Sequence, residues 1–361
     1  MWHEIAARFR ASTADVARVT IDARDLLAER VAALGLAASP LTRDLGALAL
    51  PHARSEWQLD PKYLGASARH SATSLEALVG CPLQWALKYP ADLRVGALDS
   101  IASGPRLMGT LGHRLVEELH RADALAKPGA LAEAIATTFG RLVSEEAAVL
   151  LRPGMTFELV QLRDQLAGSV SRLAEMLAES KLTVVGVEVA VDAPWRAGAL
   201  SGRLDLLLRD EAGRDVVLDL KWGGKRYREL LGSGLATQLA VYAAARMTAT
   251  NARAMPAAAY FSLSRGEVLA TSGSPFARFV PIQGPPLADT WAKLERTVDR
   301  VERKLLAGRV PVTGLQKSLP LLETLGLDAQ EQERHLALGN GSACQYCPYG
   351  AICGRDWERV T

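Results

Sequence analysis

The sequence predicts an α/β protein with a mixed central β-sheet flanked by helices. The evidence is a change in the pattern of apolar residues along the chain. Up to about residue 180, long segments repeat their apolar residues with a helical period. From residue 182, three short segments rich in β-branched residues follow one another at hairpin spacing, bounded by Gly, Pro or Asp. Further helical and strand patterns alternate after them, so one sheet covered by helices is the simplest arrangement.

The individual elements follow from the same periodicities. Thr73 or Ser74 can cap the start of the first of these helices. Helices are expected at 72–88, 107–124, 129–149, 156–180, 288–307 and over the segment that begins Gln-Leu-Ala-Val-Tyr at residue 238. Strands are expected at 182–193, 199–209, 215–222 and 257–263. Residues 1–65 are predicted to form a helical N-terminal segment of two amphipathic helices and a Pro-containing linker, separate from a domain over 66–361.

Composition excludes several classes of protein. The chain has 361 residues, of which 49% are hydrophobic and 23% charged, and a net charge of +2, so a packed core is expected and a histone-like polycation is not. No run of about 18 apolar residues predicts a membrane span, and the N-terminus lacks the apolar core of a secretory signal. A cytoplasmic location is therefore expected, where structural disulfides are rare. No Walker A sequence is present, so no ATP motor is expected.

The stretch that ends in Asp219-Leu-Lys221 has the clearest chemistry. Asp219 and Lys221 are two residues apart on an expected strand, so both side chains emerge on one face. Asp205 on the preceding strand can lie beside Asp219 across the hairpin, and two adjacent carboxylates repel unless they share a cation such as Mg²⁺ or Mn²⁺. Lys221 would then position or deprotonate a water that attacks a phosphodiester. The alternative is a surface hairpin with an ordinary Asp–Lys pair, which is common.

Two further pairs have helical spacing. His113 and Glu117 are four residues apart on one helix face, where Gly109 and Gly112 allow close backbone approach. His113 can supply a nitrogen ligand to the same metal, or simply pair with Glu117. Gln238 and Tyr242 are also four apart and follow a basic segment expected to be a loop, either a phosphate-binding feature or a solvated charge run formed by Lys225, Arg226 and Arg228.

Glu188 is the one acid in an apolar strand segment, Val-Val-Gly-Val-Glu-Val-Ala-Val. It either faces the same site or lies on an edge strand toward water.

Taken in order, these motifs resemble the PD-(D/E)XK nuclease domain of the RecB/AddB family over about residues 66–361. The resemblance implies that His113, in the Gly109-x-x-x-His113 motif, is a metal ligand. It also implies these roles: Asp205 and Asp219 as the catalytic aspartates, Lys221 as the catalytic lysine, Gln238 and Tyr242 as the Gln-x-x-x-Tyr motif, and Glu188 as a less close match to the family's acidic residue.

The resemblance further implies a restriction-endonuclease-like core and a metal-dependent deoxyribonuclease. Its Mg²⁺ or Mn²⁺ would be bound by His113, Asp205 and Asp219, with the backbone carbonyl of Leu220. The expected activity is exonucleolytic processing of single-stranded or duplex DNA ends in recombination and repair, with a helicase subunit as partner. The first 65 residues resemble a helicase-derived remnant. Two alternatives are a spacer-processing nuclease of an adaptive-immunity or phage-defence system and a DNA-end-binding module with vestigial cleavage.

The four cysteines have the number and distribution of a single metal site. Cys344, Cys347 and Cys353 form a C-x2-C-x5-C motif, and Cys81 stands alone far upstream. The spacing fits zinc or an iron–sulfur cluster, and incidental thiols are the alternative. The family resemblance implies a [4Fe–4S] cluster that closes the domain as a C-terminal iron–sulfur segment, joining its two sequence ends.

Overall fold

The computed structural model describes residues 53–64, 69–93, 104–271, 273–315, 319–338, 342–345 and 347–358. The chain divides into two compact units, 1–50 and 51–361, and the described residues belong to the second. The helices expected near the N-terminus lie outside the described residues. Residues 53–64, expected in that N-terminal segment, instead contain strand β1 (Glu56–Gln58), which pairs antiparallel with β9 (Arg309–Pro311). This stretch is therefore held by the C-terminal part of the chain.

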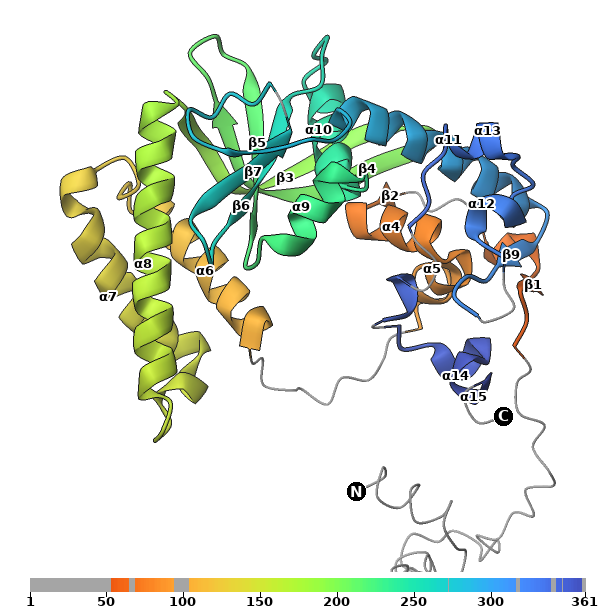
Figure 1. Ribbon diagram of the computed structural model, residues 1–361, viewed down its shortest axis with the longest axis horizontal. Helices are drawn as coiled ribbons and strands as arrows, with labels where there is room; N and C mark the ends of the chain where they lie inside the picture. The colour runs from red at the N-terminus through yellow and green to blue at the C-terminus, as the bar shows by residue number, and fades with distance from the viewer. Residues whose placement is uncertain are drawn as a thin grey trace, which may run out of the picture. The chain divides into compact units, whose positions relative to one another are not determined.

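A mixed sheet forms the centre of the described unit (Figure 1). Its long strands are β3 (Thr183–Trp195), β4 (Gly198–Arg209) and β5 (Asp215–Lys221), joined as an antiparallel meander. The remaining strands of this sheet are β2 (Arg69–His70), β6 (Ala257–Ser262), β7 (Glu267–Thr271) and β8 (Val280–Ile282). Strand order is β2-β4-β5-β6-β7-β8, with β3 on the other edge of β4.

The strand directions explain where the helices lie. Strand β6 runs parallel to β5, and a parallel neighbour requires a crossover connection. Helices α9 (Lys225–Gly232) and α10 (Thr237–Ala249) provide it. The crossover brings α10 over one face of β4 and β5, with its Leu, Val and Ala residues buried against them.

Each face of the sheet has its own apolar core (Figure 1). One contains α10 together with α4 (Ala72–Gly80), α5 (Pro82–Lys88) and α11 (Leu287–Leu306). The other contains α6 (Gly104–Arg121), α7 (Pro128–Glu146) and α8 (Thr156–Glu179). The short elements are η1 (Pro61–Tyr63), η2 (Ala148–Leu151), α12 (Leu321–Thr324), α13 (Ala329–Gln332), η3 (Ser342–Cys344), α14 (Gly350–Cys353) and α15 (Arg355–Glu358).

The α/β class with a helix-flanked mixed sheet is confirmed, and two local expectations were wrong. The helix expected over 72–88 is interrupted at Cys81, whose backbone is extended with φ −157° and ψ 104°. Pro82 follows it, and a residue before proline is disfavoured in the helical conformation. The basic segment expected to be a loop is helix α9, because Lys, Arg, Glu and Leu are all good helix formers. No described helix has the length and apolar character of a membrane span.

Candidate active site

The expected site residues converge where β4 and β5 separate. The ladder between these strands pairs Leu206 with Leu218, and the same register places Asp205 opposite Asp219 one step further. Here the Asp205 side chain accepts a hydrogen bond from the backbone of β5: Leu220 N–H donates to Oδ2 over 2.6 Å. The hairpin register thus brings the two aspartates together, as the sequence predicts.

Strand β3 contributes Glu188 from the other edge of β4. The β3–β4 register pairs Val187 with Leu206 and Val189 with Leu204, so Glu188 lies opposite Asp205. Glu188 has φ 52°, a left-handed conformation that is uncommon for a residue other than glycine and tends to persist at functional sites. Its side chain is 26% exposed and points toward His113 rather than lying free on a solvent-facing edge.

His113 reaches this point from helix α6. Its Nε2 lies 3.0 Å from the carbonyl oxygen of Leu220, and its Nδ1 lies 3.7 Å from Asp205 Oδ1 and 3.9 Å from Glu188 Oε1. An Nε2–H that donates to the carbonyl leaves the Nδ1 lone pair facing the carboxylates, the arrangement by which proteins orient a metal-binding imidazole. The expected alternative, a His113–Glu117 pair, does not occur, because Glu117 pairs with Arg114 and Arg121.

Among the described residues, His113, Glu188 and Asp205 are the group whose ligand atoms all lie within 4.8 Å of one another. One nitrogen and two carboxylates suit a divalent cation of the Mg²⁺ or Mn²⁺ kind. The sequence had placed Asp219 in this set and had left Glu188 open. The Leu220 carbonyl, expected as a further ligand, instead lies against the imidazole.

Asp219 is fully buried, and its Oδ2 lies 2.6 Å from Lys221 Nζ. Its Oδ1 has no hydrogen-bond partner in the described part of the chain. Burial and the nearby Asp205 charge raise the pKa of Asp219 to about 7. A buried carboxylate oxygen without a donor is costly and is the kind of group that a cation satisfies.

The other ionisable groups respond to the same crowding. Burial raises the pKa of Asp205 above its ordinary value. Burial opposes protonation of His113 and of Lys221, but the neighbouring carboxylates outweigh it and raise the pKa of both groups. The neighbouring His113 lowers the pKa of Glu188. Burial makes the charges of Asp205 and Asp219 costly beside each other, and a divalent cation bound between the carboxylates would stabilise their ionised forms.

The Gln238–Tyr242 pair lies along the same face of α10. Gln238 Nε2 donates to Tyr242 Oη over 3.1 Å, and burial together with the Asp219 and Asp205 charges raises the pKa of the phenol. The Tyr242 ring packs against Gly202, where an added Cβ would lie 2.9 Å from Cε1. The glycine of Gly-Arg-Leu-Asp is therefore required by the tyrosine of the later motif.

The two glycines of α6 differ in how much space a side chain would have. A Cβ on Gly112 would lie 2.6 Å from Leu263, whereas one on Gly109 would meet its nearest neighbour, Trp222, at an ordinary 3.7 Å. The expected close approach therefore holds for Gly112 and not for Gly109.

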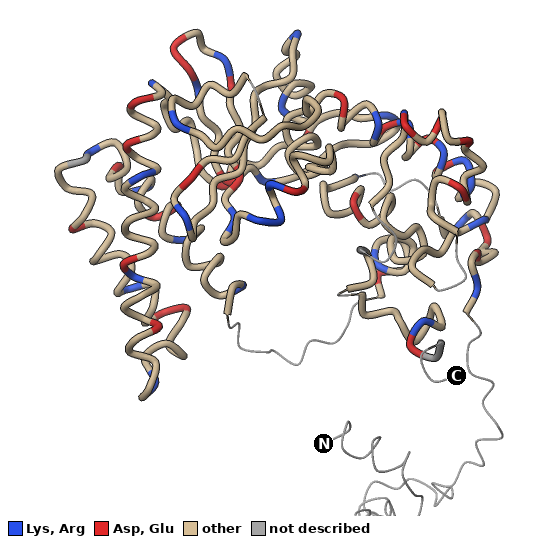
Figure 2. Tube along the Cα trace, viewed as in Figure 1, with Lys and Arg blue, Asp and Glu red and all other residues tan. Residues whose placement is uncertain are grey.

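A cavity of about 440 Å³ is lined by His113 and Glu188, and its wall contains two arginines that the sequence reasoning missed. Arg203 Nε lies 3.8 Å from Glu188 Oε2, and its side chain is 66% exposed. Arg114 follows His113 on α6 and lines the same cavity. The position of Arg203 two residues before Asp205 on one strand was the available signal. Figure 2 shows further Lys and Arg on α9, which begins four residues after Lys221.

The cysteines lie away from this site. Cys81 is buried between α4 and α5, and the segment with Cys344 packs beside it: an added Cβ on Gly80 would lie 3.3 Å from Ala343. Thr313 links the two by donating its hydroxyl to the Gly80 carbonyl, while Cys344 Sγ lies 3.7 Å from the Thr313 carbonyl.

The surroundings of Cys347 and Cys353 include the other cysteines. Burial and the charges of the three other cysteines raise the pKa of Cys347 to about 11, and those of Cys81 and Cys344 contribute to the raised pKa of Cys353. Four thiols outside any disulfide, one of them buried and three partly buried, thus come from two separate parts of the described chain, and no three of their sulfur atoms lie within 4.8 Å of one another. This donor set fits a four-thiolate metal centre, which would remove their protons.

Comparison with known proteins agrees with this geometry at the level of the family. No curated protein sequence matches the chain significantly. A model of the PD-(D/E)XK nuclease superfamily matches residues 69–354, which include every proposed ligand of both sites. This chain belongs to the PD-(D/E)XK nuclease superfamily.

Proposed function

We propose that the protein is a Mg²⁺- or Mn²⁺-dependent deoxyribonuclease whose metal is held by His113 Nδ1, Glu188 and Asp205, beside Asp219. One observation carries the proposal: these groups meet within 4.8 Å next to a buried carboxylate oxygen that has no donor among the described residues. A bound divalent ion supplies the charge that polarises a phosphodiester and acidifies a water.

Lys221 orients the attacking water in this proposal. Its pKa is raised by Asp219 and Asp205 despite burial, so it remains an ammonium at neutral pH. A permanently protonated lysine donates hydrogen bonds to water or phosphate and does not accept a proton. Asp219 fixes its position over 2.6 Å. Of the two roles that the sequence suggested for Lys221, its permanent protonation favours positioning the water over deprotonating it.

Gln238 and Tyr242 orient the site from α10, and Arg203 and Arg114 contact phosphates of the bound strand from the cavity wall. The finer assignment is an exonuclease that processes single-strand ends in repair with a helicase partner. It rests on the order of motifs shared with the RecB/AddB family.

The first prediction concerns metal and Lys221 together. Purified protein is expected to degrade labelled linear DNA in Mg²⁺ or Mn²⁺ and to stop in excess EDTA. Lys221→Ala should lower the rate by about 10²–10³-fold, the usual loss when one preorganised hydrogen-bond donor is removed, with DNA affinity changed only slightly. Closed circular single strands, used as a parallel substrate, should resist an enzyme that needs ends. Cleavage that continues in EDTA would overturn the proposal, and equal losses of cleavage and binding would make Lys221 a phosphate-gripping residue.

We propose further that Cys81, Cys344, Cys347 and Cys353 hold a [4Fe–4S] cluster. The contributions of the other cysteines to the raised pKa of Cys347 and of Cys353 support a shared centre, and the iron–sulfur identity rests on the family resemblance. Because Cys81 and Cys344 are far apart in sequence, such a centre would contribute its binding energy to folding.

The second prediction tests this centre. Cys81→Ala, purified anaerobically, should lose its iron and its brown absorbance and melt at lower temperature than wild type. Thr313→Val is the matched control, because it removes the hydrogen bond to Gly80 and leaves every thiol in place. It should keep the iron. A colourless wild-type protein that contains zinc would contradict the cluster.

A further inference from the structure

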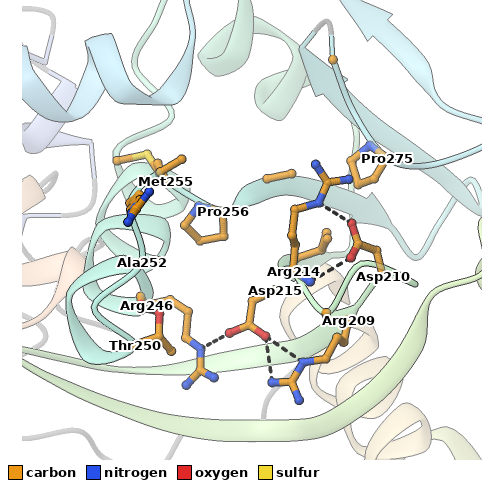
Figure 3. Close-up of a pocket in the computed structure, with 16 residues that line it drawn as sticks. Arg209, Asp210, Arg214, Asp215, Arg246, Thr250, Ala252, Met255, Pro256 and Pro275 are labelled. Atoms are coloured by element: carbon orange, nitrogen blue, oxygen red, sulfur yellow. Dashed lines mark hydrogen bonds and ion pairs between the residues drawn. The ribbon is translucent and has the colours of Figure 1, made fainter.

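A second cavity, of about 670 Å³ and lined by both charged and apolar residues, lies at the other end of the β4–β5 pair (Figure 3). The β4–β5 turn, the C-terminal end of α10 and the start of β6 surround it. Arg209 and Asp215 at this end are four residues from Asp205 and Asp219 respectively, about 13 Å along each strand. Neither the proposed catalysis nor the cysteine centre uses these groups.

Two arginines are fixed here around one carboxylate. Asp215 is largely buried, and its Oδ1 accepts from Arg209 Nε and Nη2 over 3.2 and 2.9 Å. Its Oδ2 accepts from Arg246 Nε over 2.6 Å. Figure 3 shows both guanidinium groups turned toward the same carboxylate. Because Arg246 uses only Nε on a described partner, its two terminal nitrogens remain available to a ligand.

The rest of the lining adds positive charge. Arg214 pairs with Asp210 over 2.7 Å, whereas Arg253 is exposed and makes no hydrogen bond or ion pair with the described residues. The cavity is lined by four arginines and two aspartates, which leaves a net charge of +2. A guanidinium whose position is already fixed loses little side-chain entropy on binding, and its fork matches a phosphate.

An apolar wall lies beside the charges. Met255, Pro256 and Pro275 line the cavity near the arginine groups (Figure 3). The volume is within the range of sites for small organic ligands, roughly 300–1,000 Å³. A ligand that fits both the arginine groups and the apolar wall has about two negative charges and a flat, largely apolar ring.

We propose that this cavity binds a nucleotide through its phosphomonoester, with Arg246 and Arg253 on the phosphate and the Met255–Pro256 wall against the base. Such a group is present both on a free mononucleotide and at the phosphorylated end of a DNA strand. The chemistry at the cavity is the same for either source.

Calorimetric titration of the full chain with thymidine 5′-monophosphate in EDTA tests the proposal without any cleavage, so its outcome is independent of the nuclease assay. Arg246→Gln should weaken binding by about tenfold, through loss of a charge-assisted hydrogen bond, and Arg253→Ala by a smaller factor. Arg163→Ala, an exposed arginine on α8, is the matched control and should bind as wild type. Arg253 is exposed and unpaired with the described residues, so its variant remains informative if Arg246→Gln fails to fold.

Oligothymidylates with a 5′-phosphate or a 5′-hydroxyl distinguish the two sources. An affinity gain from the phosphate that disappears in Arg246→Gln assigns the cavity to a strand end, and Arg246-dependent binding of the mononucleotide alone assigns it to free nucleotide. Thymidine binding as tightly as its monophosphate would overturn the proposal. So would affinities for the monophosphate that are identical in wild type, Arg246→Gln and Arg253→Ala.

Discussion

The two ends of the β4–β5 pair have opposite charge balance on the same face of the same strands. At one end, Asp205 and Asp219 face each other with Glu188 close by, and Lys221 pairs with Asp219. At the other end, four residues away on each strand, a single carboxylate, Asp215, lies between two guanidinium groups.

The difference shows how an antiparallel ladder can build two unlike sites. Residues four apart on a strand share a face, so each cross-strand pair repeats the same geometry with different chemistry. At the acidic end, burial makes the charges of Asp205 and Asp219 costly, which favours the binding of a cation. At the basic end, Asp215 compensates part of the charge and holds the arginines for an anion.

The largest expected effect separates the ends by function. Asp205→Asn should lower DNA cleavage by about 10³-fold or more, because it removes a ligand charge and keeps the shape. Asp215→Asn should act mainly on stability, with a loss of about 1–3 kcal/mol as two guanidinium groups lose their carboxylate. Cleavage rates and thermal melts on both variants make the comparison. The functional difference between the two ends is wrong if Asp215→Asn lowers the cleavage rate as much as Asp205→Asn does.

A smaller effect concerns pH and the acidic end alone. In the folded protein the pKa of Asp219 is about 7, against an ordinary 3.8. Between these values the folded state keeps a proton that the unfolded state has lost, so the free energy of unfolding decreases as pH rises through this window. The Asp219→Asn side chain cannot ionise, so the free energy of unfolding of this variant does not decrease for this reason. In urea titrations with EDTA, the variant should therefore gain on wild type from pH 5 to pH 8.

That gain should shrink when Mg²⁺ replaces EDTA, since the cation favours the ionised form in wild type. A stability difference that stays constant from pH 5 to pH 8 would show that burial does not raise the Asp219 pKa.

Sequence reasoning predicted most of the fold because the long elements have strong periodicity. The strands expected at 199–209 and 215–222 match β4 and β5 to within one residue at each end. The helix break at Cys81 was predictable from Pro82 and was missed. Strands β2, β8 and β9 are at most three residues long and leave no periodic signal of their own, and β2 and β9 also form through pairing with distant segments.

The candidate site divides in the same way. The Asp205–Asp219 pairing follows from hairpin register, which is local information. The position of Glu188 depends on its positive φ and on a bulge between Val184 and Gly186, neither of which the residue pattern specifies. The salt bridge that occupies Asp219 and the arginines around Asp215 depend on burial and on the position of α10, which only the folded chain determines.

The acidic end is proposed to bind one divalent cation, and Mn²⁺ binding measured by electron paramagnetic resonance tests this without any nuclease activity. We expect one Mn²⁺ per chain. Binding should be lost or strongly weakened in Asp205→Asn and in Glu188→Gln and kept in Asp164→Asn, which changes an exposed carboxylate on α8. Binding that is equally tight in Asp205→Asn and wild type would contradict it.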